Sequence, residues 1–86
     1  MKTIDEITAV VQKYAAQSNI FVTPQGPNDP LMPKPAALSQ QDQDTFFHTL
    51  LEALAQGGIK AKLPFKALMA CDTWTQVRIL IFHWQA

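Results

Sequence analysis

A dense run of prolines separates two stretches of this chain that have helical periodicity. Five of its six prolines lie close together: Pro24, Pro27, Pro30, Pro33 and Pro35. Each proline lacks a backbone N–H and holds the residue before it away from the helical conformation. We therefore expect residues 20–38 to form one long connection without regular secondary structure, anchored to the core by Leu31, Met32 and Leu38.

A helix is expected before this connection. Thr3 and Glu6 have the spacing of a capping box, in which each side chain accepts a hydrogen bond from the other residue's free backbone N–H. Apolar residues then recur at helical spacing and form one face: Ile4, Ile7, Val10, Val11 and Tyr14. We expect this helix to begin near Thr3 and to end between Gln17 and Asn19.

A longer helix is expected to begin at Ser39. Ser39 and Asp42 repeat the capping spacing, with aspartate in place of the usual glutamate or glutamine. The apolar residues of this helix make a wide stripe: Phe46, Phe47, Leu50, Leu51 and Leu54. The pair Gly57-Gly58 supplies the left-handed conformation in which many helices end.

The last part of the chain carries two further helical signals. Pro64 fits the first position of a short helix of about a turn and a half, on which Phe65, Leu68 and Met69 follow. Asp72 or Thr73 then caps a final helix, with Gln76 at capping-box spacing from Thr73. One face of that helix is shared by Trp74, Val77, Leu80, Ile81 and Trp84, while Ile79 and Phe82 fall outside it.

Some of these segments also have strand character. Residues 59–63 alternate apolar and polar side chains, and residues 76–83 are rich in β-branched and aromatic side chains. A small α+β fold with strands at 20–23, 59–63 and 76–83 beside two helices is therefore an alternative. The cap at Asp72 and Thr73 favours the all-α fold, a small four-helix bundle in a single domain over residues 1–86.

The charge balance excludes several classes of function. Seven basic and seven acidic residues give a formal net charge of zero, so the chain lacks the basic stripe of a nucleic-acid-binding protein. The longest apolar run, residues 79–82, is far too short to cross a bilayer, and Asp5 and Glu6 break any signal-peptide pattern. We expect a cytoplasmic protein that binds neither nucleic acid nor a membrane.

Residue chemistry gives little support for catalysis or for a metal. The single cysteine, Cys71, lies in an apolar context, and disulfide frameworks and zinc sites need more cysteines. The two histidines, His48 and His83, have no third group spaced to complete a triad or a set of metal ligands. We expect no enzyme activity and no metal, with Cys71 as a buried structural thiol.

Five short motifs occur in order along the chain: Thr3-Ile4-Asp5-Glu6, Leu50-Leu51-Glu52-Ala53-Leu54, Gly58-Ile59, Leu63-Pro64 and Asp72-Thr73-Trp74. Together they resemble the acyl carrier protein family. The first motif resembles the start of the family's first helix, and the second resembles the end of its second helix. The next two resemble the turn before its third helix, and the last resembles the start of its fourth. The resemblance implies a four-helix bundle with a long first loop. It also implies a role in fatty-acid, polyketide or nonribosomal-peptide biosynthesis.

In that family a serine within an aspartate-serine-leucine triplet, at the start of the second helix, carries a 4'-phosphopantetheine arm. A count back from Pro64 places the triplet near Asp44-Thr45-Phe46, so that threonine stands in the place of the serine. Ser39 is the only nearby serine, and its neighbours are leucine and glutamine rather than aspartate and leucine. The resemblance leaves Ser39 and Thr45 as candidate attachment residues, and phosphopantetheine as the one implied cofactor.

The family's second helix is usually strongly acidic and docks on basic partner enzymes. Here Asp42 and Asp44 are the acidic residues near its start, so charge steering towards a partner is weak and apolar contacts have to contribute. The candidates for those contacts are Ile79, Phe82 and Trp84. The sequence thus predicts a carrier-like domain that acts through protein–protein contacts, with or without the arm. The alternative is a small non-catalytic partner-binding protein unrelated to carriers.

Overall fold

The computed structural model describes residues 1–26 and 28–86, and Pro27, one of the prolines of the expected connection, lies outside them. The helices in this part of the chain are α1 (Ile4–Gln17), a short 3-10 helix η1 (Pro35–Ala37), α2 (Gln40–Gln56), α3 (Phe65–Met69) and α4 (Trp74–His83). The described residues contain no β-strand, only two isolated bridges. The all-α fold is therefore confirmed, and the α+β alternative is wrong.

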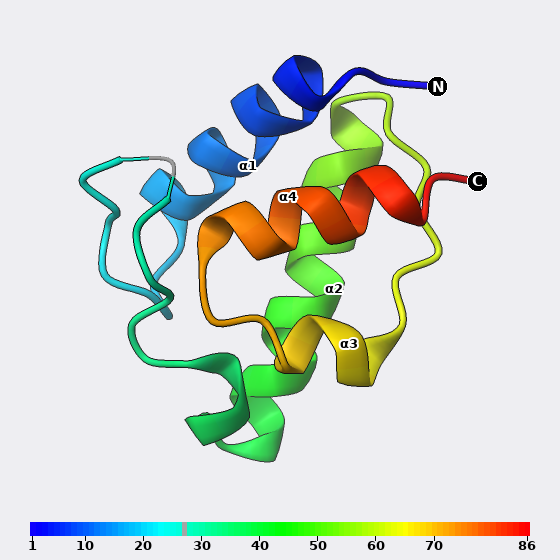
Figure 1. Ribbon diagram of the computed structural model, residues 1–86. Helices are drawn as coiled ribbons and strands as arrows, with labels where there is room; N and C mark the ends of the chain where they lie inside the picture. The colour runs from blue at the N-terminus through cyan, green and yellow to red at the C-terminus, as the bar shows by residue number, and fades with distance from the viewer. Residues whose placement is uncertain (27) are drawn as a thin grey trace.

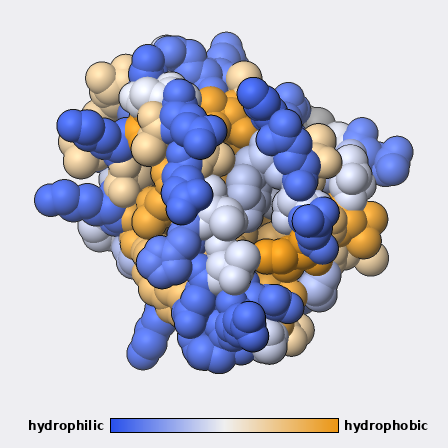
Figure 2. All heavy atoms as spheres, turned by 180° about the vertical axis from the view of Figure 1, so that it is seen from behind, coloured by the Kyte–Doolittle hydropathy of each residue, from blue (hydrophilic) through white to orange (hydrophobic). Residues whose placement is uncertain are grey.

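The helices pack around one core. Figure 1 shows α4 crossing in front of α2, with α1 above it and α3 below. Contacts join α1 to α2 and α4, and α3 to α2, α4 and η1. The face opposite α4 is mainly hydrophilic, with hydrophobic side chains in separate patches (Figure 2).

Local capping explains where α1 and α2 begin. The Thr3 hydroxyl accepts from the Glu6 N–H at 3.2 Å, and the Glu6 carboxylate accepts from the Thr3 N–H at 3.2 Å, which completes the predicted box. The Ser39 hydroxyl accepts from the Asp42 N–H at 3.1 Å. Ile4, predicted on the apolar face of α1, is 41% exposed because the first turn of the helix extends beyond the core.

The end of α2 is a Schellman motif, in which two N–H groups satisfy the last free carbonyls of the helix. The Ile59 N–H donates to the Leu54 carbonyl at 2.8 Å, and the Gly58 N–H donates to the Ala55 carbonyl at 3.0 Å. Gly58 has φ = 77° and is the residue that takes the left-handed conformation, whereas Gly57 does not. Ile59 and Leu54 are both buried, so the motif also turns the chain back into the core.

We expect Gly58→Ala to lower the free energy of unfolding by about 1–2 kcal/mol, because an L-residue is strained in the left-handed region. An added Cβ would meet only the Lys2 side chain at 3.6 Å, an ordinary contact, so the loss would come from the backbone. Urea denaturation measures it. Gly58→Asn is the matched control and should lose less, since asparagine tolerates this conformation; equal losses for both variants would refute this explanation.

The segment from Ile59 to Thr73 differs from its prediction in two places. Residues 59–63 form no strand, and Ala61 makes only an isolated bridge to Gln85. Pro64 precedes α3 as its N-cap residue, with φ −68° and ψ 127°, instead of occupying the first helical position. It has the extended conformation usual for an N-cap residue, and its carbonyl accepts the first helical hydrogen bond, from the Leu68 N–H at 3.1 Å.

The capping box at Thr73 and Gln76 is present and makes residues 76–83 helical in spite of their strand propensity. This helix buries Trp74, Val77 and Ile81 on one face. Trp84, predicted to extend that face, is 42% exposed. The reason is that α4 ends at His83, so the helical periodicity does not continue to Trp84.

The proline-rich connection is held against the rest of the chain by backbone hydrogen bonds. Leu31 is 1% exposed, and its N–H donates to the Asp72 carbonyl at 2.9 Å. Leu38 is half-buried, but Met32 is 55% exposed, so its predicted anchoring role is wrong. The expectation of no regular structure here is also wrong, because Pro35 begins η1, where its missing N–H costs nothing.

Four aromatic rings join the connection to α1, α2 and α4. Phe21 packs edge-on against Phe46 and Trp74, with ring centroids 4.8 and 5.4 Å away. Tyr14 lies 6.3 Å from Phe46 and 6.5 Å from Trp74. The Trp74 indole N–H has no hydrogen-bond partner in the described part of the chain, so this residue contributes through packing.

The two ends of the chain meet. The Lys2 backbone N–H donates to the Gln85 side-chain oxygen at 2.7 Å, and the Gln85 amide donates to the Lys2 carbonyl at 3.0 Å. Figure 1 shows both termini on the same side of the molecule. This clasp closes the bundle next to the turn that follows α2.

Candidate functional site

The two candidate attachment residues lie at different positions on α2. Ser39 is exposed at the start of the helix, and its oxygen accepts the Asp42 N–H, which leaves the hydroxyl proton free. Thr45 is exposed within the helix, and its carbonyl accepts from the Thr49 hydroxyl at 2.7 Å. Six residues separate them, about 9 Å along the axis, so they do not form one site.

The acidic and apolar candidates for partner binding also lie apart. Asp42 and Asp44 are exposed near the start of α2, and neither belongs to an ion pair among the described residues. Ile79 and Phe82 are 58% and 43% exposed, three residues apart on α4 and hence on one face of it. In Figure 1, α4 crosses α2 far from the end at which α2 begins. The third apolar candidate, Trp84, is 42% exposed directly after α4. A partner would have to span both regions to contact all five side chains.

Ile79 also borders a hollow of about 370 Å³ between α3 and α4. The residues that line it are Ala67, Ala70, Cys71, Gln76, Ile79, Leu80 and His83. A cysteine and a histidine in one hollow raise the question of a nucleophile and its base. However, burial raises the pKa of the Cys71 thiol to about 11, and the nearby Asp72 carboxylate adds to the effect. A reactive cysteine needs the opposite shift, so this pair is not arranged for thiolate chemistry.

We expect the stability of the protein to fall as the pH rises from about 9 to about 11, because the unfolded chain loses the Cys71 proton first. Below this range both states keep the proton and the contribution is fully present. Urea denaturation at neutral pH and within the range measures it, with Cys71→Ala as the reference that should show a smaller fall. Rapid reaction of the native thiol with a disulfide reagent near neutral pH would contradict the assignment.

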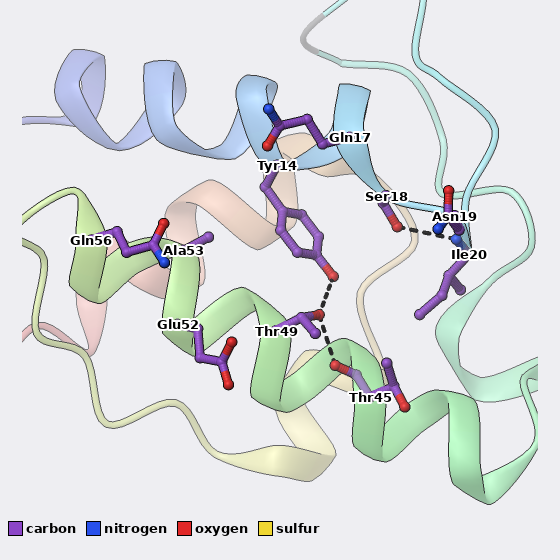
Figure 3. Close-up of a pocket in the computed structure, with 10 residues that line it drawn as sticks. All are labelled: Tyr14, Gln17, Ser18, Asn19, Ile20, Thr45, Thr49, Glu52, Ala53 and Gln56. Carbon is purple, nitrogen blue, oxygen red and sulfur yellow. Dashed lines mark hydrogen bonds between the residues drawn. The ribbon is translucent and has the colours of Figure 1, made fainter.

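A second hollow, of about 330 Å³, lies between the end of α1 and the middle of α2 (Figure 3). It is lined by Tyr14, Gln17, Ser18, Asn19, Ile20, Thr45, Thr49, Glu52, Ala53 and Gln56. We call it the α1–α2 pocket. Thr45 is the only predicted site residue that borders it, so sequence reasoning missed this pocket. The available signal was the occurrence of polar side chains, such as those of Tyr14 and Thr49, beside the apolar faces of the two helices.

Tyr14 and Thr49 form the best-defined polar contact in the pocket. The Tyr14 hydroxyl lies 2.8 Å from the Thr49 hydroxyl, and Figure 3 shows the two side chains meeting between the helices. The Thr49 hydroxyl also lies 2.7 Å from the Thr45 carbonyl, which can only accept, so we assign the Thr49 proton to that carbonyl and the Tyr14 hydroxyl as the donor to Thr49. Burial raises the pKa of Tyr14, although hydrogen bonding to Thr49 and Ser18 opposes this shift.

The burial of Arg78 was also not predicted from the sequence. Arg78 is 9% exposed, and its guanidinium donates to Asn28 at 3.3 Å and to Thr75 at 3.0 Å. The Thr75 hydroxyl in turn donates to the Asn28 side chain. These bonds attach the proline-rich connection to α4, so we assign Arg78 a structural role.

The described residues contain no group of histidine, cysteine or acidic side chains able to hold a metal ion. In the same part of the chain, no helix combines the length and the apolar character needed to cross a membrane.

Comparisons with known proteins give no relative. No family model matches the sequence, no curated protein matches it, and no solved structure matches the fold.

Proposed function

We propose that this chain is an acyl-carrier-like domain that acts through protein–protein contacts, in fatty-acid, polyketide or nonribosomal-peptide biosynthesis. The observation that carries the binding role is the exposure of Ile79 and Phe82 on one face of α4. Exposed apolar side chains grouped on one face are typical of interaction surfaces. The class of partner comes from the motif resemblance. The order of the elements agrees with it: a long helix, a long loop, a second long helix, a short helix and a final helix.

Binding to purified ketosynthase and acyltransferase domains tests this role. We expect Ile79→Asp with Phe82→Asp to weaken binding at least about tenfold, since charges at a desolvated contact are costly. Val22→Asp is the matched control, because Val22 is an exposed apolar residue in the connection and is 63% exposed. Equal effects of the two changes, or no binding to any such domain, would refute the proposal.

The second candidate is a carrier that bears an arm on Ser39. It is favoured by one observation, an exposed hydroxyl with a free proton at the start of the long helix. Intact mass after incubation with coenzyme A and a broad-specificity phosphopantetheinyl transferase tests it, beside a carrier known to be modified. We expect the mass of one arm on the original chain if this candidate holds, and no gain if the domain acts without an arm.

The variants in that experiment have to separate lost attachment from lost folding. Ser39→Ala removes a helix cap worth about 1 kcal/mol, whereas Ser39→Asn keeps a capping oxygen and removes the hydroxyl. Loss of the mass gain in Ser39→Asn, with the gain kept in Thr45→Ala, assigns the arm to Ser39. The reverse pattern assigns it to Thr45.

A further inference from the structure

The α1–α2 pocket has a single charged group. Glu52 is the only ionisable acid or base besides Tyr14 among the described residues that line it. It is exposed, and the two ion pairs in the described part of the chain, Lys2 with Glu6 and Lys34 with Asp72, do not involve it. The pocket therefore offers a carboxylate with no cation paired to it. An anionic ligand would be repelled, and a cationic one attracted.

Two of the four hydroxyl groups among the described residues that line the pocket, those of Tyr14 and Thr49, are set to accept hydrogen bonds from a ligand rather than to donate them. Thr49 uses its proton on the Thr45 carbonyl at 2.7 Å, and Tyr14 uses its proton on Thr49 at 2.8 Å. A hydroxyl oxygen that has donated its proton still has lone pairs to accept from a ligand. The Tyr14 oxygen is thus an acceptor held in place at the pocket wall.

The other residues that line the pocket suit a ligand with an apolar stem, because they combine apolar surface with polar side chains. Ile20 and Ala53 supply apolar surface, and the Gln17 and Gln56 amides can turn to offer either an oxygen or an N–H. Glu52 lies three residues after Thr49 on α2, so both project from the same side of the helix. The volume of about 330 Å³ is at the lower end of the range for small-molecule sites.

We propose that the α1–α2 pocket binds a ligand with a primary ammonium group on a short apolar stem. The Glu52 carboxylate pairs with the ammonium group, the Tyr14 oxygen accepts one of its three N–H bonds, and the stem lies against Ala53 and Ile20. The chemistry is the same for a free amine and for a lysine side chain of another protein. This proposal does not depend on the carrier-like function.

Amide chemical shifts measured by NMR during a titration with n-butylamine, near neutral pH and at constant ionic strength, test the proposal. We expect saturating shifts confined to residues 14–20 and 45–56. n-Butanol and butyrate have similar stems without the positive charge, and they should bind at least about fivefold more weakly, as expected for loss of a solvent-exposed charge-assisted contact. Equal shifts with n-butanol, or none with n-butylamine, would overturn the proposal.

Two variants test the assigned contacts. Glu52→Gln should weaken n-butylamine binding about fivefold and make it similar to that of n-butanol. Asp44→Asn is the matched control, because it removes the same charge from an exposed position on the same helix without lining the pocket. Unchanged binding by Glu52→Gln, or equal weakening by both variants, would show that no pairing with Glu52 occurs and would refute the proposal.

A second titration distinguishes the two sources of the ammonium group. Lysine blocked as an amide at both ends presents the same group with peptide bonds around it. Binding of both probes indicates a pocket open to a side chain of a partner protein. Binding of n-butylamine alone indicates a free amine, because the pocket then excludes a peptide backbone.

Discussion

Phe46→Ala is expected to lower the free energy of unfolding by about 3–5 kcal/mol, the usual range for removing a buried aromatic ring. Phe46 is fully buried, and its ring packs against Phe21 at 4.8 Å and Tyr14 at 6.3 Å. The cavity would lie where α1, α2 and the proline-rich connection meet, so none of these elements could collapse into it without leaving the others. Proteins of this kind have total stabilities of roughly 5–15 kcal/mol, so this one change would remove a large share of the total.

Phe47→Ala is the matched control for this prediction. Phe47 is the next residue of α2, is half-buried, and contacts the Phe65 ring at 5.2 Å near the surface. Its loss should cost clearly less, because only part of the ring is removed from water. Urea denaturation of both variants measures the difference. Similar losses would mean that Phe46 does not lie at the centre of the core.

Leu31→Ala is expected to cost about 2–5 kcal/mol, although Leu31 belongs to the proline-rich connection and to no helix. Its side chain is 1% exposed, and its N–H donates to the Asp72 carbonyl immediately before α4. A loop residue with this burial contributes to stability as a helix residue would, because the hydrophobic effect depends on the area removed from water.

Met32→Ala is the matched control for Leu31→Ala. Met32 follows Leu31 and is 55% exposed, so its truncation should change the free energy of unfolding by no more than about 0.5 kcal/mol. The two substituted residues are neighbours in the chain, but only Leu31→Ala is expected to lower the free energy of unfolding substantially. If both changes were neutral in urea denaturation, the connection would not be packed on the core as described.

The parts of the fold that the sequence predicts well depend on residues close together in the chain. The caps at Thr3, Ser39 and Thr73 each involve a partner three residues away, and the turn at Gly58 needs one glycine. The exposure of Ile79 follows from helical spacing alone. These features are encoded locally, so a single sequence is enough to find them.

The errors arise where distant segments decide the outcome. Leu31 and Met32 are apolar neighbours in a loop, and both take part in backbone hydrogen bonds to distant residues. The Leu31 N–H donates to the Asp72 carbonyl, and the Met32 carbonyl accepts from the Val22 N–H, while only Leu31 turns inward. Arg78 is buried because Asn28 and Thr75 accept from it. The α1–α2 pocket has one wall from residues 14–20 and the other from residues 45–56. No pattern within either stretch indicates that the two lie face to face.

The clasp between Lys2 and Gln85 has a consequence for how this fold can be combined with others. Because Lys2 and Gln85 are held side by side, a host protein could carry the bundle within a surface loop, entering and leaving it at nearly one point. The host's own loop ends would not have to move apart. Linear fusion to other domains at both ends would, for the same reason, place those domains next to each other rather than at opposite poles.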